Sequence, residues 1–158
     1  MKSIFTPWRM TFIKGPKPDE CVFCKKAKTP EKDEENFVLA RGKTCFAILN
    51  LYPYSTGHVL VIPYRHTSDF AKLESIESNE MMDMAKEFVT VITKALKPDG
   101  FNLGMNLGKT AGAGIAEHLH LHIVPRWDGD NNFMPVVGNI KVHPTDLPTI
   151  YKQLKEYL

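Results

Sequence analysis

Three histidines alternate with leucine in one short segment of the chain, at His118, His120 and His122. Successive side chains of a β-strand leave opposite faces, so we expect the imidazoles to share one face while Leu119 and Leu121 point into a core. Three imidazoles on a buried stripe would each need a hydrogen-bond partner, so chance core residues are a poor explanation. The pattern favours a histidine nucleophile whose neighbours orient it and hold the charge of the substrate.

A metal site is the alternative interpretation of the same row. A strand from His118 to His122 spans about 13 Å, whereas a Zn–N bond is about 2.0 Å, so one ion could bind all three imidazoles only if the strand bent. We therefore favour the nucleophile. A module that binds zinc or a nucleotide without turnover stays open as an alternative.

A second group of candidate ligands lies earlier in the chain. Cys21 and Cys24 have the two-residue gap of half a zinc site, and His66 with His118 could supply the other half. Such a Cys2His2 site would be structural, because protein side chains would fill all four positions. The alternative is a pair of reduced cysteines without a metal. Cys45 alternates with apolar residues and is expected to be a small core residue.

Three further features could support chemistry. The glycine-rich loop 108–114 precedes the histidines, and its amides, above all at Gly112, Ala113 and Gly114, could bind phosphate. Taken alone, the loop is better explained as a flexible hairpin connection, but its position next to the histidines favours phosphate binding. His58 opens an apolar segment and could support the site from behind, or be an ordinary hydrogen-bonded residue. Trp127 could pack on a base or cover the pocket, or belong to the core.

Composition excludes several classes of protein. The chain has 158 residues and a formal net charge of +2, which suits one soluble domain and argues against nucleic-acid or anionic-membrane binding. No apolar run approaches the ~20 residues that span a bilayer. The N-terminal residues lack an apolar signal core, and an odd cysteine count suits a reducing compartment, so we expect a cytoplasmic location.

The hydrophobic pattern predicts an α+β fold. Short apolar runs at 37–40, 45–50, 58–63 and 101–107, together with the histidine segment, suit antiparallel strands. Between them, apolar residues recur at helical spacing from Met81 to Leu96, with Ser78 or Asn79 as the expected cap and the segment 98–100 as the stop. Since strands and helices do not alternate regularly, a βαβ architecture is not expected.

Two blocks of the sequence resemble the histidine-triad (HIT) family. His118–Leu–His120–Leu–His122–Ile–Val is similar to its signature, and the segment 50–66 is similar to its other conserved block. The resemblance covers residues 21–127, and the continuation Pro125–Arg126–Trp127 is most similar to the bacterial diadenosine tetraphosphate phosphorylase branch. It implies one domain over 1–158, with an extended arm at 1–20, the core at 21–127 and a C-terminal segment at 128–158. It further implies an antiparallel half-barrel of about five strands, one long helix, a C-terminal helix and a homodimer.

The resemblance also implies a reaction on adenine nucleotides. His120 would attack the α-phosphorus and form a covalent nucleotidyl-histidine, which phosphate or water then releases. His118 would be a zinc ligand or orienter, as in zinc-bearing members and in galactose-1-phosphate uridylyltransferases, and His122 would contact phosphate. The implied nucleotide-binding residues are Ile48 at the base, Asn50 at the ribose, Asn106, the loop residues 112–114 and Trp127, with His58 behind them. No catalytic metal is required, although magnesium can accompany a polyphosphate.

The resemblance leaves the substrate open. Cleavage of dinucleoside polyphosphates, by phosphorolysis or hydrolysis, is the expected activity, and an adenosine phosphoramidase or another nucleotidyl hydrolase is the alternative. Many relatives carry Gln followed by Ser or Thr where this chain has Gly114 and Ile115. The change removes a polar side chain from the expected phosphate site, which disfavours diadenosine triphosphate hydrolysis and suits a phosphorylase.

Overall fold

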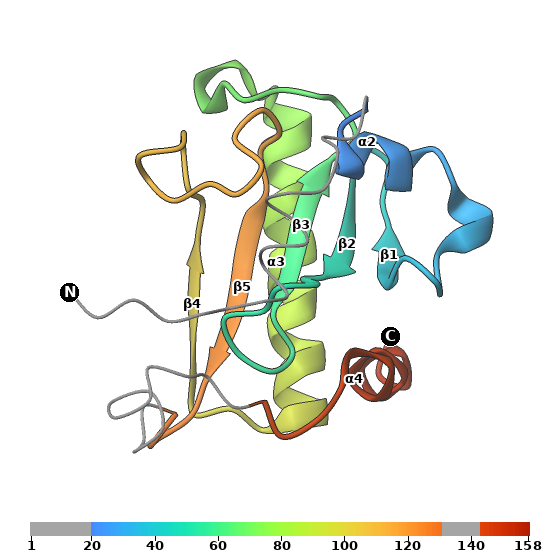
Figure 1. Ribbon diagram of the computed structural model, residues 1–158, viewed down its shortest axis with the longest axis vertical. Coiled ribbons are helices and arrows are strands. Elements are labelled where there is room, and N and C mark those ends of the chain that lie inside the picture. The colour runs from blue at the N-terminus through green and yellow to red at the C-terminus, as the bar shows by residue number, and fades with distance from the viewer. Residues whose placement is uncertain (1–19, 131–142) are drawn as a thin grey trace.

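The structure is a computed structural model and describes residues 20–130 and 143–158. Five strands form one antiparallel sheet in the order β1-β2-β3-β5-β4 (Figure 1). The strands are β1 (Val38–Arg41), β2 (Cys45–Leu49), β3 (Val59–Pro63), β4 (Gly100–Gly104) and β5 (Leu121–Arg126). The predicted α+β class and the predicted sheet of five antiparallel strands are confirmed. The predicted N-terminal arm lies, apart from residue 20, outside the described residues.

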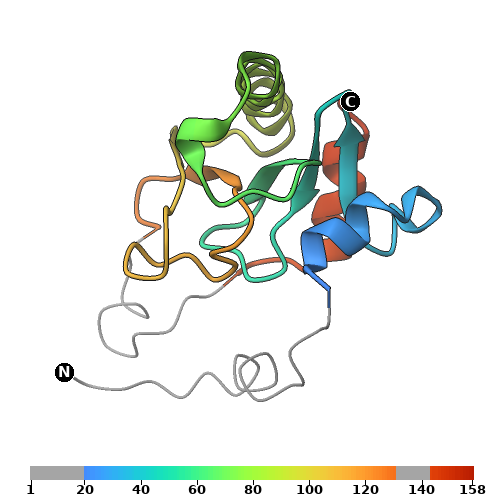
Figure 2. The same cartoon turned by 90° about the horizontal axis from the view of Figure 1, so that it is seen from above.

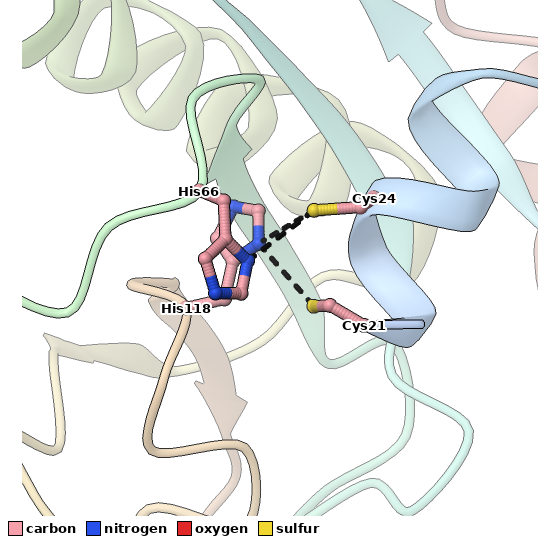
Figure 3. Close-up of side chains that lie close together, drawn as sticks. All are labelled: Cys21, Cys24, His66 and His118. Carbon is pink, nitrogen blue, oxygen red and sulfur yellow. Dashed lines mark hydrogen bonds between the residues drawn. The ribbon is translucent and has the colours of Figure 1, made fainter. Parts of the chain in front are cut away.

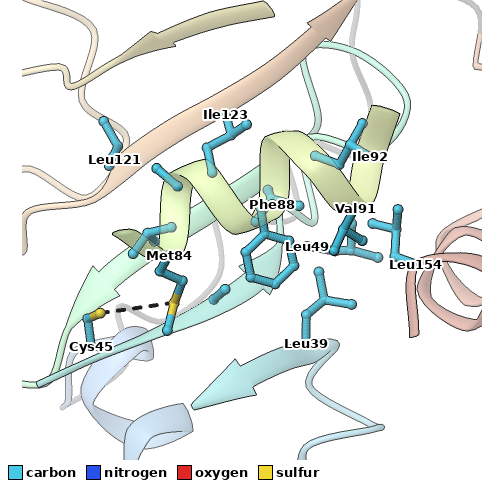
Figure 4. Close-up of a cluster of buried hydrophobic side chains, with 14 of the residues drawn as sticks. Leu39, Cys45, Leu49, Met84, Phe88, Val91, Ile92, Leu121, Ile123 and Leu154 are labelled. Atoms are coloured by element: carbon cyan, nitrogen blue, oxygen red, sulfur yellow. Dashed lines mark hydrogen bonds between the residues drawn. The ribbon is translucent and has the colours of Figure 1, made fainter. Parts of the chain in front are cut away.

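The main core lies between one face of the sheet and two helices. The long helix α3 (Ser75–Leu96) packs along the sheet, and α4 (Leu147–Lys155) packs beside its end (Figures 1 and 4). Phe88 of α3 is fully buried in this core. Cys45 is also fully buried there, as expected, and burial raises the pKa of its thiol to about 12. Alternation along β3 sends Val59 and Val61 into this core.

The long helix starts four or five residues earlier than the sequence predicted. It begins at Ser75, and Glu74 precedes it as the N-cap, instead of Ser78 or Asn79. The backbone N–H of Glu74 donates to the Glu77 carboxylate at 2.8 Å, so the two glutamates form a capping box. This reciprocal pair satisfies N–H groups of the first turn, and the cap therefore needs no serine or asparagine side chain.

A second apolar cluster lies on the other face of the sheet. The short helix α2 (Val22–Ala27) covers this face, and the 3₁₀ turn η1 (Pro30–Lys32) follows it. In the view from above, α2 and α3 lie on opposite sides of the sheet (Figure 2). The buried residues of the cluster are Phe23, Val38, Phe46, Ile48, Leu60 and Ile62. Because Leu60 pairs with His122 across β3 and β5, the third histidine belongs to this same face.

The histidine segment departs from the predicted strand. β5 begins only at Leu121, so His122 lies in the strand while His118 and His120 precede it. The pairing of β3 with β5 stops at Val61 and Leu121, although β3 continues to Pro63, so the backbone groups before Leu121 find other partners. The N–H of Leu119 donates to the Thr67 carbonyl at 2.8 Å. Within β5 the predicted alternation holds, because Leu121 and Ile123 enter the main core.

The two edges of the sheet differ in their surroundings. At the β1 edge, Tyr151 Oη donates to the Val38 carbonyl at 3.2 Å and Lys155 Nζ to the Leu39 carbonyl at 3.1 Å, so α4 covers this edge. At the β4 edge, Asn102 and Leu103 are exposed. Among the described residues, no helix combines the length and the apolar character needed to cross a membrane.

Candidate active site and metal centre

Four predicted ligands come together at the N-terminal end of α2. Cys21 Sγ lies 3.4 Å from His118 Nδ1, and Cys24 Sγ lies 3.3 Å from His66 Nδ1 and 3.6 Å from His118 Nδ1. The four donor atoms all lie within 4.8 Å of one another, and their side chains point toward a common centre (Figure 3). Residues nearly a hundred positions apart in the sequence therefore meet, as the sequence predicted.

The donor set fits a tetrahedral zinc ion. Bonds of about 2.3 Å to sulfur and about 2.0 Å to nitrogen place tetrahedral S and N ligands about 3.5 Å apart, close to the three distances observed. His118 Nε2 donates to the Pro63 carbonyl at 2.8 Å, which leaves the Nδ1 lone pair for a metal. Burial, followed by the neighbouring Cys21 thiol, raises the pKa of Cys24, and a divalent cation at the centre would favour the thiolate instead.

The middle histidine has one nitrogen occupied and one available. His120 Nδ1 lies 2.9 Å from the backbone carbonyl of His118. A carbonyl only accepts hydrogen bonds, so the proton of the neutral ring resides on Nδ1 and the lone pair on Nε2. Burial lowers the pKa of His120, which keeps the ring neutral. The result is an unprotonated Nε2 that can act as a nucleophile at neutral pH.

The third histidine is oriented by a chain of hydrogen bonds that starts at the backbone. The N–H of Tyr54 donates to His58 Nδ1 at 3.0 Å, so the proton of His58 is on Nε2. His58 Nε2 lies 2.9 Å from His122 Nδ1 and donates to it, so His122 carries its proton on Nε2. Among the described residues, His122 Nε2 is the buried side-chain nitrogen or oxygen that has no hydrogen-bond partner.

That unpartnered N–H lies beside the candidate nucleophile. The rings of His120 and His122 are 4.9 Å apart between centroids. Burial, and after it the adjacent His120, lower the pKa of His122 to about 4, so His122 is neutral near pH 7. Since a buried donor without a partner costs free energy, the arrangement is suited to an acceptor oxygen from a ligand.

The predicted nucleotide-binding residues are placed in different surroundings. Asn50 is half-buried, with Nδ2 3.3 Å from His58 Nδ1, and Ile48 is buried in the second apolar cluster. Gly112 adopts a φ of +92°, which favours glycine, and a Cβ there would lie 3.8 Å from the Asn106 amide nitrogen. Asn106 and the loop 112–114 therefore adjoin one another. The structure places the remaining residue, Trp127, past the end of β5, where it lines a hollow of ≈ 430 Å³ with Thr56 and Leu96.

Two aromatic residues of the site were not predicted. Phe23 packs against His118 and His120, with ring centroids 5.5 and 5.3 Å away. Tyr54 stacks on His122 at 5.5 Å with 21° between the ring planes. Both lie inside motifs that the sequence displays, the Cys-x-x-Cys pair and the segment before His58. Their position within those motifs was the available signal.

Comparison with known proteins adds a family to this geometry. A model of the HIT domain matches residues 31–129. The chain belongs to the HIT family. It is 42% identical to the AP-4-A phosphorylase of Mycobacterium tuberculosis. The 151 aligned residues cover 91% of this chain and 77% of that protein. It is 33% identical over 138 residues to an adenosine 5'-monophosphoramidase of Saccharomyces cerevisiae, covering 87% of this chain and 80% of that protein.

Solved HIT structures share the fold. A Zn-bound histidine triad family protein from Mycobacterium smegmatis matches with a TM-score of 0.70 at 27% identity and covers 87% of this chain and 92% of that chain. A hypothetical histidine triad nucleotide-binding protein from Sulfolobus tokodaii matches with a TM-score of 0.66 at 30% identity, covering 87% and 88%. The predicted family and fold are therefore confirmed.

Proposed function

We propose that this HIT protein cleaves dinucleoside polyphosphates of the diadenosine tetraphosphate type through a covalent nucleotidyl-His120 intermediate. The observation that carries the proposal is the pair of complementary nitrogens at the centre of the site. His120 Nε2 offers a lone pair, and the buried His122 Nε2 offers an N–H that has no partner in the described protein. A phosphoryl group between them would meet a nucleophile and a donor together.

The reaction has two balanced steps. His120 Nε2 attacks the α-phosphorus, a P–N bond forms, and the P–O bond to the leaving ATP breaks with its electron pair staying on that oxygen. An oxygen of inorganic phosphate or water then attacks the same phosphorus and gives up its proton to solvent. The P–N bond breaks to restore the imidazole lone pair, which releases ADP or AMP. His122 donates to the phosphoryl oxygens in both steps, and the glycine-rich loop, with Gly112, Ala113 and Gly114, supplies backbone amides.

The remaining predicted roles extend this proposal to the nucleotide. Asn50 would contact the ribose, Ile48 the base, and Asn106 and Trp127 would complete the binding residues. His58 would support His122 from behind. Support comes from the His58 contacts and from the shared surroundings of Asn106 and the loop.

We further propose that zinc is the resident metal, held by Cys21, Cys24, His66 and His118. A filled tetrahedral set leaves no position for substrate, so the ion would stabilise the fold and hold His118. The Zn-bound relative from Mycobacterium smegmatis supports this assignment. The carbonyl of His118 in turn accepts from His120, so the metal ligands adjoin the nucleophile.

The test is a comparison of wild-type protein with His120→Ala, using Cys45→Ala, which lies in the main core, as the control outside the site. Wild type should convert diadenosine tetraphosphate with inorganic phosphate to ADP and ATP and carry an acid-labile adenylyl group on His120. His120→Ala should lose activity by ~10³-fold or more and still unfold at a similar temperature. A variant that kept a tenth of the activity would rule out His120 as the nucleophile.

The second candidate is an adenosine phosphoramidase, favoured by the likeness to the yeast enzyme. Both reactions would use the same histidines, and they differ in the leaving group. Parallel assays with adenosine phosphoramidate, with diadenosine tetraphosphate, and with and without inorganic phosphate separate them. Faster release of AMP from the phosphoramidate, together with phosphate-independent rates, would replace the first proposal with the second.

The proposal extends to the assembly and the location of the protein. We propose a homodimer in which the β4 edges of two copies pair, because α4 covers the β1 edge and leaves Asn102 and Leu103 exposed at the other. A cytoplasmic location is supported by the three free cysteines, since zinc binding at Cys21 and Cys24 needs reduced thiols.

A further inference from the structure

Phe23 lies between the metal ligands and the histidine nucleophile. It follows Cys21 by two positions and precedes Cys24 directly, and its side chain is buried. Its ring meets His118 edge-on, at 5.5 Å and 89°, and meets His120 at 5.3 Å and 57°. One aromatic side chain therefore packs against both a ligand and the nucleophile.

The place of Phe23 depends on how α2 is held. At the C-terminal end of α2, Arg41 donates to the Ala27 carbonyl at 3.0 Å and to the Lys26 carbonyl at 2.8 Å. At the other end, Cys21 and Cys24 direct their sulfurs to the histidine nitrogens (Figure 3). A six-residue helix is too short to be stable by itself, so these attachments, together with packing in the second apolar cluster, determine where the Phe23 ring lies.

A second connection runs through His118. Its Nδ1 faces the two sulfurs, and its backbone carbonyl accepts from His120 Nδ1 at 2.9 Å. His120 is therefore contacted both by the Phe23 ring and by the His118 carbonyl, and each of these groups adjoins or belongs to a metal ligand. One contact restrains the ring by packing, and the other by a hydrogen bond.

We propose that Phe23 is a positioning residue, which couples metal occupancy of the cysteine–histidine cluster to the orientation of the His120 imidazole. This inference rests on the proposed reaction at His120. Without a cation, the two thiols lose their common partner, and α2 is then held by Arg41, by the contact of Lys26 with Asn36, and by its packing in the second apolar cluster. The Phe23 ring then stops confining His120, whose Nε2 no longer points at the α-phosphorus, and a misdirected nucleophile lowers kcat.

The experiment compares wild type, Phe23→Leu and Phe88→Leu in zinc-loaded and metal-free forms. Phe88→Leu is the matched control, because Phe88 is buried to a similar extent on the other face of the sheet. Metal removal should lower kcat of wild type and of the control by about tenfold, with KM within about threefold. Zinc-loaded Phe23→Leu should already be about tenfold slower at similar KM, and metal removal should change it less than about threefold. If Phe23→Leu does not fold, Phe23→Met is measured in its place.

A readout without turnover separates this proposal from the proposed function. Nitrogen NMR of the His120 ring should shift when zinc is added to wild type and to Phe88→Leu, and the shift should fall to less than about half in Phe23→Leu. An equal shift in all three proteins, or a Phe23→Leu defect in KM alone, would overturn the positioning role. If wild type formed no adenylyl adduct on His120 but its ring nitrogens still shifted on zinc addition, the proposed reaction would be refuted. The proposed coupling would remain supported.

Discussion

The Nε2 nitrogen of His58 lies 2.9 Å from Nδ1 of His122, and the direction of this hydrogen bond is determined by the backbone. Because the N–H of Tyr54 occupies His58 Nδ1, His58 can only donate toward His122. His122 must then present a second N–H, on Nε2, to the place where a phosphoryl oxygen would bind. The main-chain amide of Tyr54 therefore determines, through His58, that His122 acts as a hydrogen-bond donor at Nε2.

His58→Phe should slow the reaction without abolishing binding. The substitution keeps an aromatic ring but removes the donor to His122, whose proton can then move to Nδ1 and leave Nε2 without its N–H. Since one donor to a developing anion contributes about 3 kcal/mol, a partial loss predicts a fall in kcat of about 10- to 100-fold. Steady-state kinetics, with the melting temperature measured in parallel, check this. A folded variant with wild-type kcat would contradict the relay.

Replacing a metal ligand should remove the metal and destabilise the fold. Purified wild type should contain about one equivalent of zinc by elemental analysis, and Cys24→Ser should contain less than about a tenth of that. We expect the melting temperature to fall in Cys24→Ser and in chelator-treated wild type alike. Cys45→Ala is the control, since Cys45 lies in the main core, and it should retain its zinc. Equal zinc contents in the two variants would show that the cluster is not the binding site.

The stability of the protein should decline in acid because of His122. Burial lowers its pKa from 6.5 to about 4, so between these values the unfolded chain binds more protons than the folded protein. The free energy of unfolding therefore rises with pH across this window. The contribution of His122 is lost as the pH falls from 6.5 toward 4. The loss is on the order of 2 kcal/mol between pH 6.5 and about pH 5.

Urea unfolding of wild type and His122→Gln at several pH values measures this effect. The difference between the two proteins isolates the histidine, because acid release of any metal affects both. The slope of stability against pH should be shallower in the variant, while the remaining slope includes His120, whose pKa burial also lowers. Parallel curves for the two proteins would show that His122 titrates normally in the folded state.

A charge on the β4 edge should prevent dimer formation. Leu103 is 46% exposed on this strand, and Leu103→Glu would place two carboxylates close together where the strands of two copies meet. Light scattering should give the mass of a dimer for wild type and of a monomer for the variant. Phe70→Glu, at an equally exposed apolar residue outside the sheet, should stay dimeric. A dimeric Leu103→Glu would exclude this edge as the interface.

Residue types and spacing were sufficient for the local features of this protein. The alternation around His122 correctly placed Leu121 and Ile123 in the main core, because the direction of a side chain in a strand depends only on the parity of its position. The Cys-x-x-Cys pair with two distant histidines correctly predicted a four-residue cluster. The alternation needs only one short segment, whereas the cluster was recognisable from its residue types and the cysteine spacing, although its four members meet only in the folded chain.

Only the tertiary structure decided how the histidines are used. His58 and His122 are 64 positions apart, and their bond depends on the register between β3 and β5. The pairing of β3 with β5 stops at Val61 and Leu121, which leaves His118 and His120 outside the predicted strand. The backbone carbonyls nearby then determine which ring nitrogen of each carries a proton. Hydrogen-bond partners are set by how separate segments meet in space, and no periodicity within one segment records that meeting.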